Sequence, residues 1–90
     1  MHVTFDPGKR AKTLAERGLD FARAPELFKG ITVTLEDSRL DYGEPRCITL
    51  GYLDGRMVVV VWTRRGRSRR IISMRKANER EIAKFKQAVG

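Results

Sequence analysis

Apolar and polar residues alternate along the second half of the chain with the two-residue period of β-strands. Four segments show this alternation or a continuous apolar run: residues 31–38 (ITVTLEDS), 47–53 (CITLGYL), 57–63 (MVVVVWT) and 69–76 (RRIISMRK). The Asp54-Gly55 pair is typical of a hairpin turn, and RRGRS before the last segment supplies another. The unbroken valines indicate a central strand covered on both faces. We therefore expect a meander of four antiparallel strands.

The first part of the chain predicts a short edge strand and a helix. Residues 2–5 (HVTF) alternate between polar and apolar side chains. The helix is expected from Pro7 to Arg17, because Asp6 is a suitable N-cap, proline is tolerated at the first helical position, and Gly18 suits a C-cap. Leu14 is expected to anchor the apolar side of this helix.

Two further helices follow from the spacing of apolar side chains. Asp20 can cap the second, where Pro25 is tolerable only within the first turn and Gly30 marks the end. Asn78 can cap the third helix, and Glu81 three positions later completes a capping-box pattern. The apolar stripes of these two helices are Phe21, Ala24, Leu27 and Phe28 in the second, and Ile82, Phe85 and Val89 in the third.

These elements predict an α+β fold in one domain that spans residues 1–90. We expect two N-terminal helices and one C-terminal helix to cover one side of an antiparallel β-sheet meander. In the first strand of the meander, Ile31, Val33 and Leu35 are expected to share the half-buried side. The polar loop at residues 39–46 carries Asp and Glu side chains, which we expect to lie well away from the basic segment.

Basic residues are concentrated in the last two strands. The formal net charge is +8, and no acidic residue lies between Gly55 and Asn78. The 8 basic residues of that segment are Arg56, Arg64, Arg65, Arg67, Arg69, Arg70, Arg75 and Lys76. Such a field attracts a polyanion, either nucleic acid or an acidic protein segment. The simpler alternative is that the arginines only keep the domain soluble, but arginine in place of lysine suits bidentate recognition of phosphate or carboxylate.

The reactive residue types limit the possible chemistry. His2 is the only histidine and Cys47 the only cysteine, so we expect no metal centre, no cofactor, no internal disulfide and no histidine-activated nucleophile. The RRGRS segment lacks the strand-to-helix context of a nucleotide-binding glycine loop. No apolar run approaches the roughly 20 residues of a membrane helix, and no signal-peptide core is present, so we expect a cytoplasmic protein.

Guanidinium groups with a few hydroxyls can still cleave RNA, because the ribose 2′-OH is an internal nucleophile. The protein need only orient it in line and stabilise the charge that develops on the phosphate. Arg69 and Arg75 are expected on the same strand face as Ser73. Thr63 and Ser73 are equally ordinary β-sheet residues. Lys9 is a candidate general base if nearby arginines favour its uncharged form, although it also fits an exposed lysine in a first helical turn.

Several segments resemble the BrnT toxins of bacterial type II toxin–antitoxin systems. These segments are FDPGK (residues 5–9), RGLDF (17–21), VVVVWTRRG (58–66) and RRIISMRKANEREIAKF (69–85). The most specific part of the pattern is Thr63-Arg64, then Arg70-Ile71-Ile72-Ser73, Arg75, Ala77 and Glu81. The resemblance extends from Phe5 to about Phe85.

This resemblance implies a RelE-like fold and a ribonuclease that cleaves RNA without a metal and inhibits translation. It also implies a cognate BrnA-like antitoxin, which neutralises the toxin and forms with it a hetero-oligomer that binds operator DNA. Carried over by position, the catalytic residues are Lys9, Thr63, Arg64, Ser73 and Arg75. The expected RNA-binding residues on the same arginine-rich surface are Arg65, Arg67, Arg69 and Arg70.

The chain departs from the family's pattern at several positions. Val3 stands where the family often has an aromatic residue, Thr13 where it has asparagine, and Phe85 where tyrosine is frequent. Arg17 replaces a histidine that is usual there, so any proton transfer by that histidine is not available to this chain. Two other interpretations use the same basic face: a non-catalytic RNA- or DNA-binding module, and an adaptor that docks an acidic protein.

Overall fold

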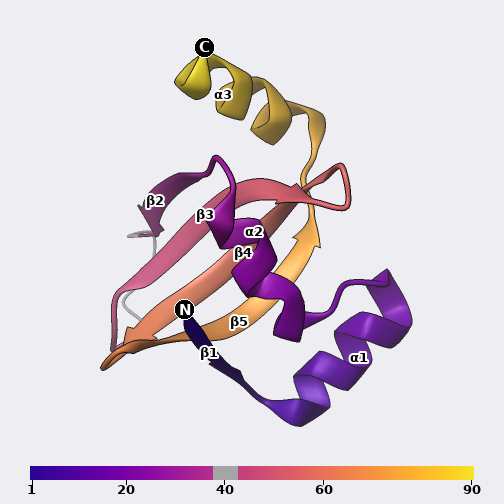
Figure 1. The fold of residues 1–90 in the computed structure, drawn as a ribbon, viewed down its shortest axis with the longest axis vertical. Helices are drawn as coiled ribbons and strands as arrows, with labels where there is room; N and C mark the ends of the chain where they lie inside the picture. Colours follow the sequence, from indigo (N-terminus) through magenta and orange to yellow (C-terminus); the bar gives the residue numbers. More distant parts are fainter. Residues whose placement is uncertain (38–42) are drawn as a thin grey trace.

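The computed structural model describes residues 1–37 and 43–90, so residues 38–42 of the expected polar loop lie outside the described part. Its strands are β1 (His2–Phe5), β2 (Val33–Asp37), β3 (Arg46–Leu53), β4 (Arg56–Arg65) and β5 (Ser68–Lys76). Its helices are α1 (Pro7–Arg17), the short 3-10 helix η1 (Phe21–Arg23), α2 (Ala24–Lys29) and α3 (Glu79–Val89). Together they form an α+β fold built on one five-stranded sheet (Figure 1).

The strand order is β1-β5-β4-β3-β2, so the predicted four-strand meander is confirmed. Strand β1 is an edge strand, as expected, but it pairs with β5 in parallel, with His2 opposite Ser68 and Phe5 opposite Ile71. The expectation of a wholly antiparallel sheet is therefore wrong, and the sheet is mixed. No tight turn links β1 to β5, and only a tight turn would have required antiparallel pairing.

The hairpin between β3 and β4 turns at the predicted Asp54-Gly55 pair. Both residues have positive φ angles, 54° and 75°, which is the backbone of a type I′ turn. Between β4 and β5, Gly66 has a φ of 60° and the turn is equally short. The sequence signals for both hairpins are confirmed.

Strand β4 lies at the centre of the sheet, and its valines are buried from both sides. Val58 and Val60 belong to a core shared with η1 and α2, on what we call the α2 face of the sheet. Val59 belongs to a second core with Phe85 of α3, on what we call the α3 face. The predicted central strand is thus confirmed, and it divides the apolar interior into two layers.

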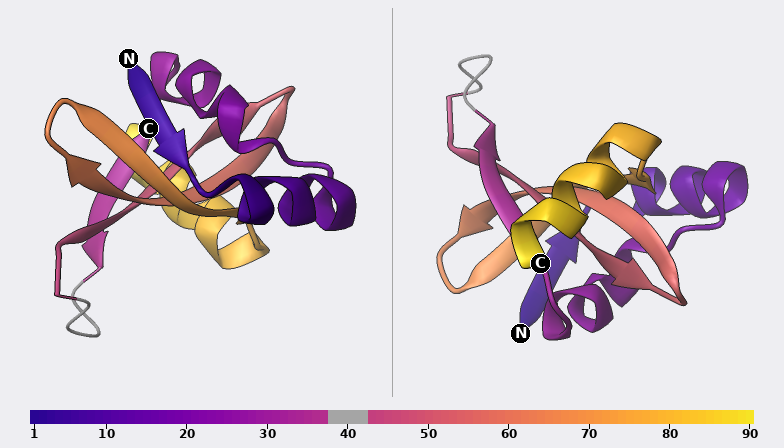
Figure 2. Two further views of the ribbon diagram at one scale, coloured as in Figure 1. Left: turned by 90° about the horizontal axis from the view of Figure 1, so that it is seen from below. Right: turned by 90° about the horizontal axis from the view of Figure 1, so that it is seen from above.

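The expectation that all helices cover one side of the sheet is wrong. Figure 2 shows α2 and α3 on opposite sides of the sheet. The reason lies in β4, since a strand that is apolar on both faces needs cover on both faces. Phe85, with Ile82 beside it, supplies that cover on the α3 face.

Helix α1 has the predicted caps but not the predicted apolar anchor. The Asp6 side chain accepts hydrogen bonds from the backbone of Gly8 and Lys9, and Gly18 adopts the left-handed C-cap conformation. Leu14, however, is 44% exposed, and no residue of α1 is buried. Polar contacts hold the helix instead: Arg17 donates to the backbone oxygen of Met74 in β5 at 2.7 Å.

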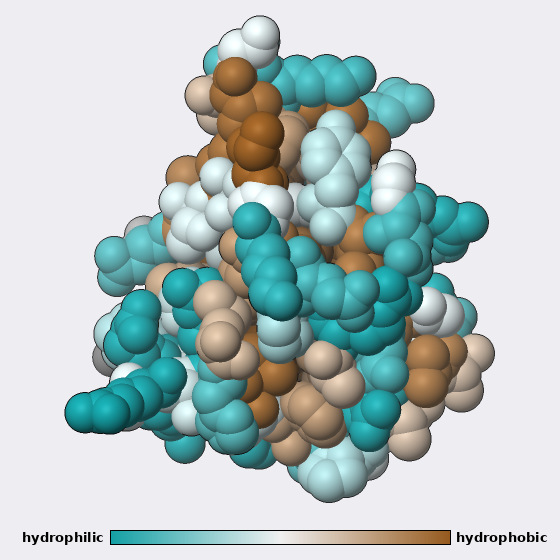
Figure 3. Space-filling view, in the orientation of Figure 1, coloured by the Kyte–Doolittle hydropathy of each residue, from teal (hydrophilic) through white to brown (hydrophobic). Residues whose placement is uncertain are grey.

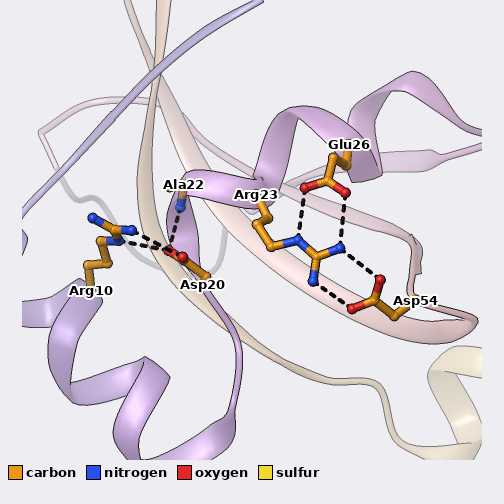
Figure 4. A network of polar contacts seen from close by, with 6 residues as sticks. All are labelled: Arg10, Asp20, Ala22, Arg23, Glu26 and Asp54. Carbon is orange, nitrogen blue, oxygen red and sulfur yellow. Dashed lines mark hydrogen bonds and ion pairs between the residues drawn. The ribbon is translucent and has the colours of Figure 1, made fainter.

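Two arginines, through three carboxylate partners, fix the helices to each other and to the sheet (Figure 4). Arg10 of α1 donates two hydrogen bonds to Asp20, which also caps η1. Arg23 donates two hydrogen bonds each to Glu26 and to Asp54, and so joins the start of α2 to the β3–β4 turn. These bidentate contacts therefore orient α1 and the start of α2, while the buried apolar side chains of η1 and α2 pack on the sheet.

Strand β2 is shorter and more exposed than its sequence suggests. It begins at Val33, which packs against the α3-face core. Ile31 lies before the strand and is 70% exposed, and Leu35 is 53% exposed. The predicted half-buried side is thus wrong for Ile31 and Leu35. The cause is position, because β2 is an edge strand and does not have a neighbour on each side.

Close packing of α2 on β3 predicts that Gly51→Ala destabilises the fold. A Cβ atom at Gly51 would lie 2.9 Å from Cδ2 of Leu27 and 3.0 Å from Cγ2 of Thr32. Because Leu27 is fully buried, we expect a loss of about 1–3 kcal/mol in the free energy of unfolding, measured by urea denaturation. Gly30→Ala is the matched control, since the nearest atom to its Cβ is 3.7 Å away. Equal stability of the two variants would contradict this account.

Candidate functional site

A β-bulge decides which face each arginine of β5 occupies. Val61 lies opposite Ser73, but the next residue, Trp62, lies opposite Ile71, so Ile72 is an extra residue in β5. As a result Ile71 and Met74 share the core of the α2 face although they are three positions apart. The predicted alternation over residues 69–76 is therefore wrong.

The arginines consequently separate. Arg69 points to the α2 face, while Arg75 and Ser73 point to the α3 face, so Arg69 and Arg75 do not share a face as predicted. On the α3 face, Thr63 is the strand neighbour of Arg70, and Val61 is that of Ser73. We call the line formed by Arg70, Ser73 and Arg75 the α3-face strip.

Arg75 at one end of the strip is paired with a carboxylate from α3. Its guanidinium donates to both oxygens of Glu81 at 2.8 and 2.7 Å. Glu81 also accepts from the backbone N–H of Asn78, and the Asn78 side chain accepts from that of Glu81, which confirms the predicted capping box. The hydrogen bonds from Arg75 lower the pKa of Glu81 from its ordinary value of 4.5. The ion pair therefore ties β5 to the start of α3.

Arg70 at the other end of the strip has a different environment. Its side chain makes no hydrogen bond or ion pair with residues in 1–37 or 43–90. Its charge and that of Lys9 both act on Asp6, whose pKa is lowered first by the hydrogen bonds from the backbone of Lys9 and Gly8. Asp6, the N-cap of α1, is thus within electrostatic range of both Arg70 and Lys9.

Thr63 is buried and has a structural partner. It is 1% exposed, and its hydroxyl donates to the backbone oxygen of Pro45 at 2.6 Å. The side chain thereby holds the segment before β3 against the end of β4. Among the candidate residues, Thr63 has the least access to a substrate.

Arg64 and Arg69 form a separate group on the α2 face, where they are strand neighbours. The guanidinium carbon of Arg69 lies 4.4 Å from the ring centres of both Phe28 and Trp62. That of Arg64 lies 5.8 Å from the Trp62 ring centre. Burial, and then the charge of Arg64, lower the pKa of Arg69. Arg64 is thus brought together with Arg69 and not with Ser73 and Arg75.

The remaining arginines of the hairpin also differ from one another. Arg65 on the α3 face pairs with Glu44 at 3.0 Å, so an acidic residue of the polar loop does reach the basic segment, contrary to expectation. Arg67 lies exposed in the β4–β5 turn. Figure 3 shows hydrophilic side chains over much of the surface in the view of Figure 1, with smaller apolar areas between them.

Two residues near the strip were not selected from the sequence. His2 of β1 is exposed and lies opposite Ser68, next to the pairing of Thr4 with Arg70, and so on the α3 face. His2 lies on this face because β1 pairs in parallel with β5, and no local pattern in the sequence predicts that pairing. Arg17 lines a hollow of about 390 Å³ together with Glu16, Arg75 and Lys76. Arg17, Arg75 and Lys76 are three cations in this lining against one carboxylate, which suits an anion. The sequence feature that could have drawn attention to Arg17 is its place at a position where the family usually has histidine.

Other kinds of site find little support in the described ranges. No group of three or more His, Cys, Asp or Glu side chains in residues 1–37 and 43–90 could hold a metal ion. Cys47 is half-buried and packs against the α2-face core. No helix in the described part of the chain is long and apolar enough to cross a lipid bilayer.

An α+β domain with guanidinium groups on both faces of one hairpin is suited to binding a polyanion. Comparison with protein families gives a specific class: residues 5–81 match the ribonuclease toxin, BrnT, of type II toxin–antitoxin systems. The match covers most of the chain, so the chain belongs to the BrnT family, and the resemblance seen in the sequence is confirmed. Family membership implies an RNA substrate and a cognate antitoxin. No curated protein matches the chain.

The Arg75–Glu81 pair makes stability sensitive to acid. Because the pKa of Glu81 is lower in the folded than in the unfolded protein, the stabilisation is present above about pH 4.5 and is lost as the pH falls through the lowered pKa. We expect Glu81→Gln to be less stable than wild type at neutral pH, and to lose less stability on acidification. Urea denaturation over a pH series measures both. An unchanged pH profile would assign the acid effect to other carboxylates.

Proposed function

We propose that the chain is a metal-independent endoribonuclease toxin that cleaves RNA on the α3-face strip and thereby inhibits translation. The observation that carries this proposal is Arg70, a half-buried residue whose guanidinium pairs with no carboxylate of the described residues. It shares its face with the hydroxyl of Ser73 and with Arg75. Family membership supplies the substrate class, which is RNA.

The reaction proposed here uses the nucleophile that RNA already contains. The 2′-oxygen attacks the adjacent phosphorus and the bond from phosphorus to the 5′-oxygen breaks, which leaves a 2′,3′-cyclic phosphate. The 2′-proton passes to a base, and the leaving 5′-oxygen takes a proton from water to become a hydroxyl. Negative charge grows on the phosphate oxygens, and preorganised guanidinium donors stabilise it. Arg70 and Arg75 provide these donors, and Ser73 provides a hydroxyl hydrogen bond. No metal is needed for any of these steps.

Glu81 and Thr63 are proposed to position this strip. The two hydrogen bonds from Arg75 to Glu81 hold the guanidinium in one orientation, and its side chain stays 46% exposed. Thr63, through its bond to Pro45, fixes the end of β4 beside Arg70. Arg64 is proposed to bind RNA and not to act in the chemical step, because it lies on the opposite face.

Lys9 is the proposed proton acceptor. It is exposed in the first turn of α1, and it shares the neighbourhood of Asp6 with Arg70. A lysine in this place can either take the 2′-proton or act as a further cation on the phosphate. Replacement of Lys9 by arginine separates the two roles. Arginine keeps the positive charge but does not exchange protons near neutral pH.

The regulation that we propose follows the family. A cognate BrnA-like antitoxin, itself a DNA-binding protein, covers the arginine-rich surface in the cytoplasm and neutralises the toxin. The resulting hetero-oligomer binds operator DNA. The excess of arginine over carboxylate on the hairpin supports a partner that offers carboxylates to the same groups that hold RNA phosphates.

Expression without an antitoxin tests the activity itself. We expect growth arrest of a bacterial host, and cleavage of RNA by the purified protein that is unchanged by EDTA, because guanidinium groups replace a metal in stabilising charge. Growth curves and gel electrophoresis of RNA provide the measurements. Normal growth with intact RNA would leave the non-catalytic binding module or the adaptor as the function.

Arg70→Ala tests the location of the site. We expect cleavage to fall by about 10²–10³, the size of effect seen when one preorganised transition-state donor is removed. Arg80→Ala is the control, because it removes the same charge from an exposed position on α3. Circular dichroism verifies that both variants fold. Equal cleavage by the two variants would move the active site away from the strip.

Lys9→Arg and Lys9→Met separate proton transfer from charge stabilisation. If Lys9 is the base, both variants lose cleavage to a similar extent, by about 10²–10⁴. If it acts only as a cation, Lys9→Arg retains most of the activity and Lys9→Met does not. Initial rates of cleavage over a pH series measure the difference.

A further inference from the structure

Arg64 and Arg69 are held together in an unusual way on the α2 face. They lie opposite each other on neighbouring strands, where like charges are destabilising. The rings of Phe28 and Trp62 meet edge to face, 5.8 Å between centres at 82°, and Arg69 contacts both. The two perpendicular rings thus hold the guanidinium of Arg69 on the strand next to Arg64.

The charges of this pair are not compensated within the described residues. Arg10, Arg23, Arg65 and Arg75 each have a carboxylate partner. Arg64 and Arg69 have contacts with rings but no ion pair within residues 1–37 and 43–90. Burial and the charge of Arg64 both act against the charged form of Arg69. An anion bound between the two would remove this cost.

The chemistry of the pair favours a phosphate as that anion. Contact with a ring occupies the flat face of a guanidinium and leaves the N–H groups at its edge able to donate in a fork. Trp62 is only 4% exposed, so its ring offers no free surface on which a base could stack. The site therefore suits the RNA backbone more than the bases.

The β4–β5 hairpin connects this pair to the strip on the other face. Its turn projects at one end of the sheet (Figure 2). Arg67 lies in that turn, and Arg70 lies on the α3 face beyond it. A flexible single strand can follow cations over such a turn from one face of the sheet to the other.

We propose that Arg64 and Arg69 form a second phosphate-binding site, so that single-stranded RNA passes over the β4–β5 turn and is held on both faces of the sheet. This inference rests on the proposed ribonuclease function, since it takes RNA as the ligand. It assigns to the α2 face a binding role that is separate from the chemistry on the α3-face strip.

Salt-dependent binding of an uncleavable RNA tests this site. A fluorescent single-stranded oligonucleotide with 2′-O-methyl groups lacks the nucleophile, so fluorescence anisotropy reports binding alone. Each phosphate contact on a single strand contributes about 0.7 to the slope of log affinity against log salt concentration. We expect Arg64→Gln and Arg69→Gln each to reduce this slope by about 0.7, and the double variant by roughly twice that. Arg80→Gln, the matched loss of an exposed charge, should leave the slope unchanged.

Several outcomes would overturn the inference. A wild-type slope in Arg64→Gln would do so, and Arg64 is exposed, so this variant should fold even if Arg69→Gln does not. Unchanged RNA binding together with weaker binding of the antitoxin would assign the pair to an acidic protein instead. If the reduced slopes appear but the wild-type protein cuts no RNA, the binding site stands and the proposed catalytic function fails.

Discussion

Burial of the β4 valines on both faces of the sheet constrains the rest of the structure. A buried valine contributes about 1.5–3 kcal/mol only if apolar groups cover it. The covering groups are Leu27 of α2 on one face and Phe85 of α3 on the other. The apolar groups bury the first half of β4 and Trp62. Residues 64–67, which follow Thr63 in the hairpin, are exposed. Charged residues are therefore concentrated where the two apolar layers end.

The few carboxylates of the chain are used to fix its architecture. Asp20 joins α1 to η1, Asp54 joins the β3–β4 turn to α2, and Glu81 joins α3 to β5, each through an arginine. Exposed pairs of this kind contribute little stability, about 0–1 kcal/mol each, but forked geometry gives them orientation. These three acids have partners elsewhere. At the end of the β4–β5 hairpin, Glu44 pairs with Arg65. Arg64, Arg69 and Arg70 have no ion pair within the described residues. The excess positive charge of the chain thus becomes a localised surface.

Local signals in the sequence were sufficient for the elements and insufficient for their arrangement. Caps such as Asp6 and Asn78, and the Asp54-Gly55 turn, depend on neighbours within a few residues, so they could be predicted. The parallel pairing of β1 depends on contacts more than sixty residues apart, which no local pattern encodes. The sequence also singled out the basic hairpin as the candidate functional surface, and this role stays a prediction. The division of its arginines between the two faces of the sheet could not be predicted, because the alternation of side chains holds only in a regular strand and β5 contains a bulge.

Ile72 has a consequence that reaches beyond its own position. As the one extra residue in β5, it sets the phase between the arginines near the turn and those near α3. Because the bulge absorbs this residue, Arg70 shares a face with Ser73 and Arg75 although it lies an odd number of positions from both. In a regular strand of the same length, Arg69 would join Ser73 and Arg75, and Arg70 would lie on the α2 face. The backbone conformation at one apolar residue, and not the arginine content of β5, therefore decides which cations share a face.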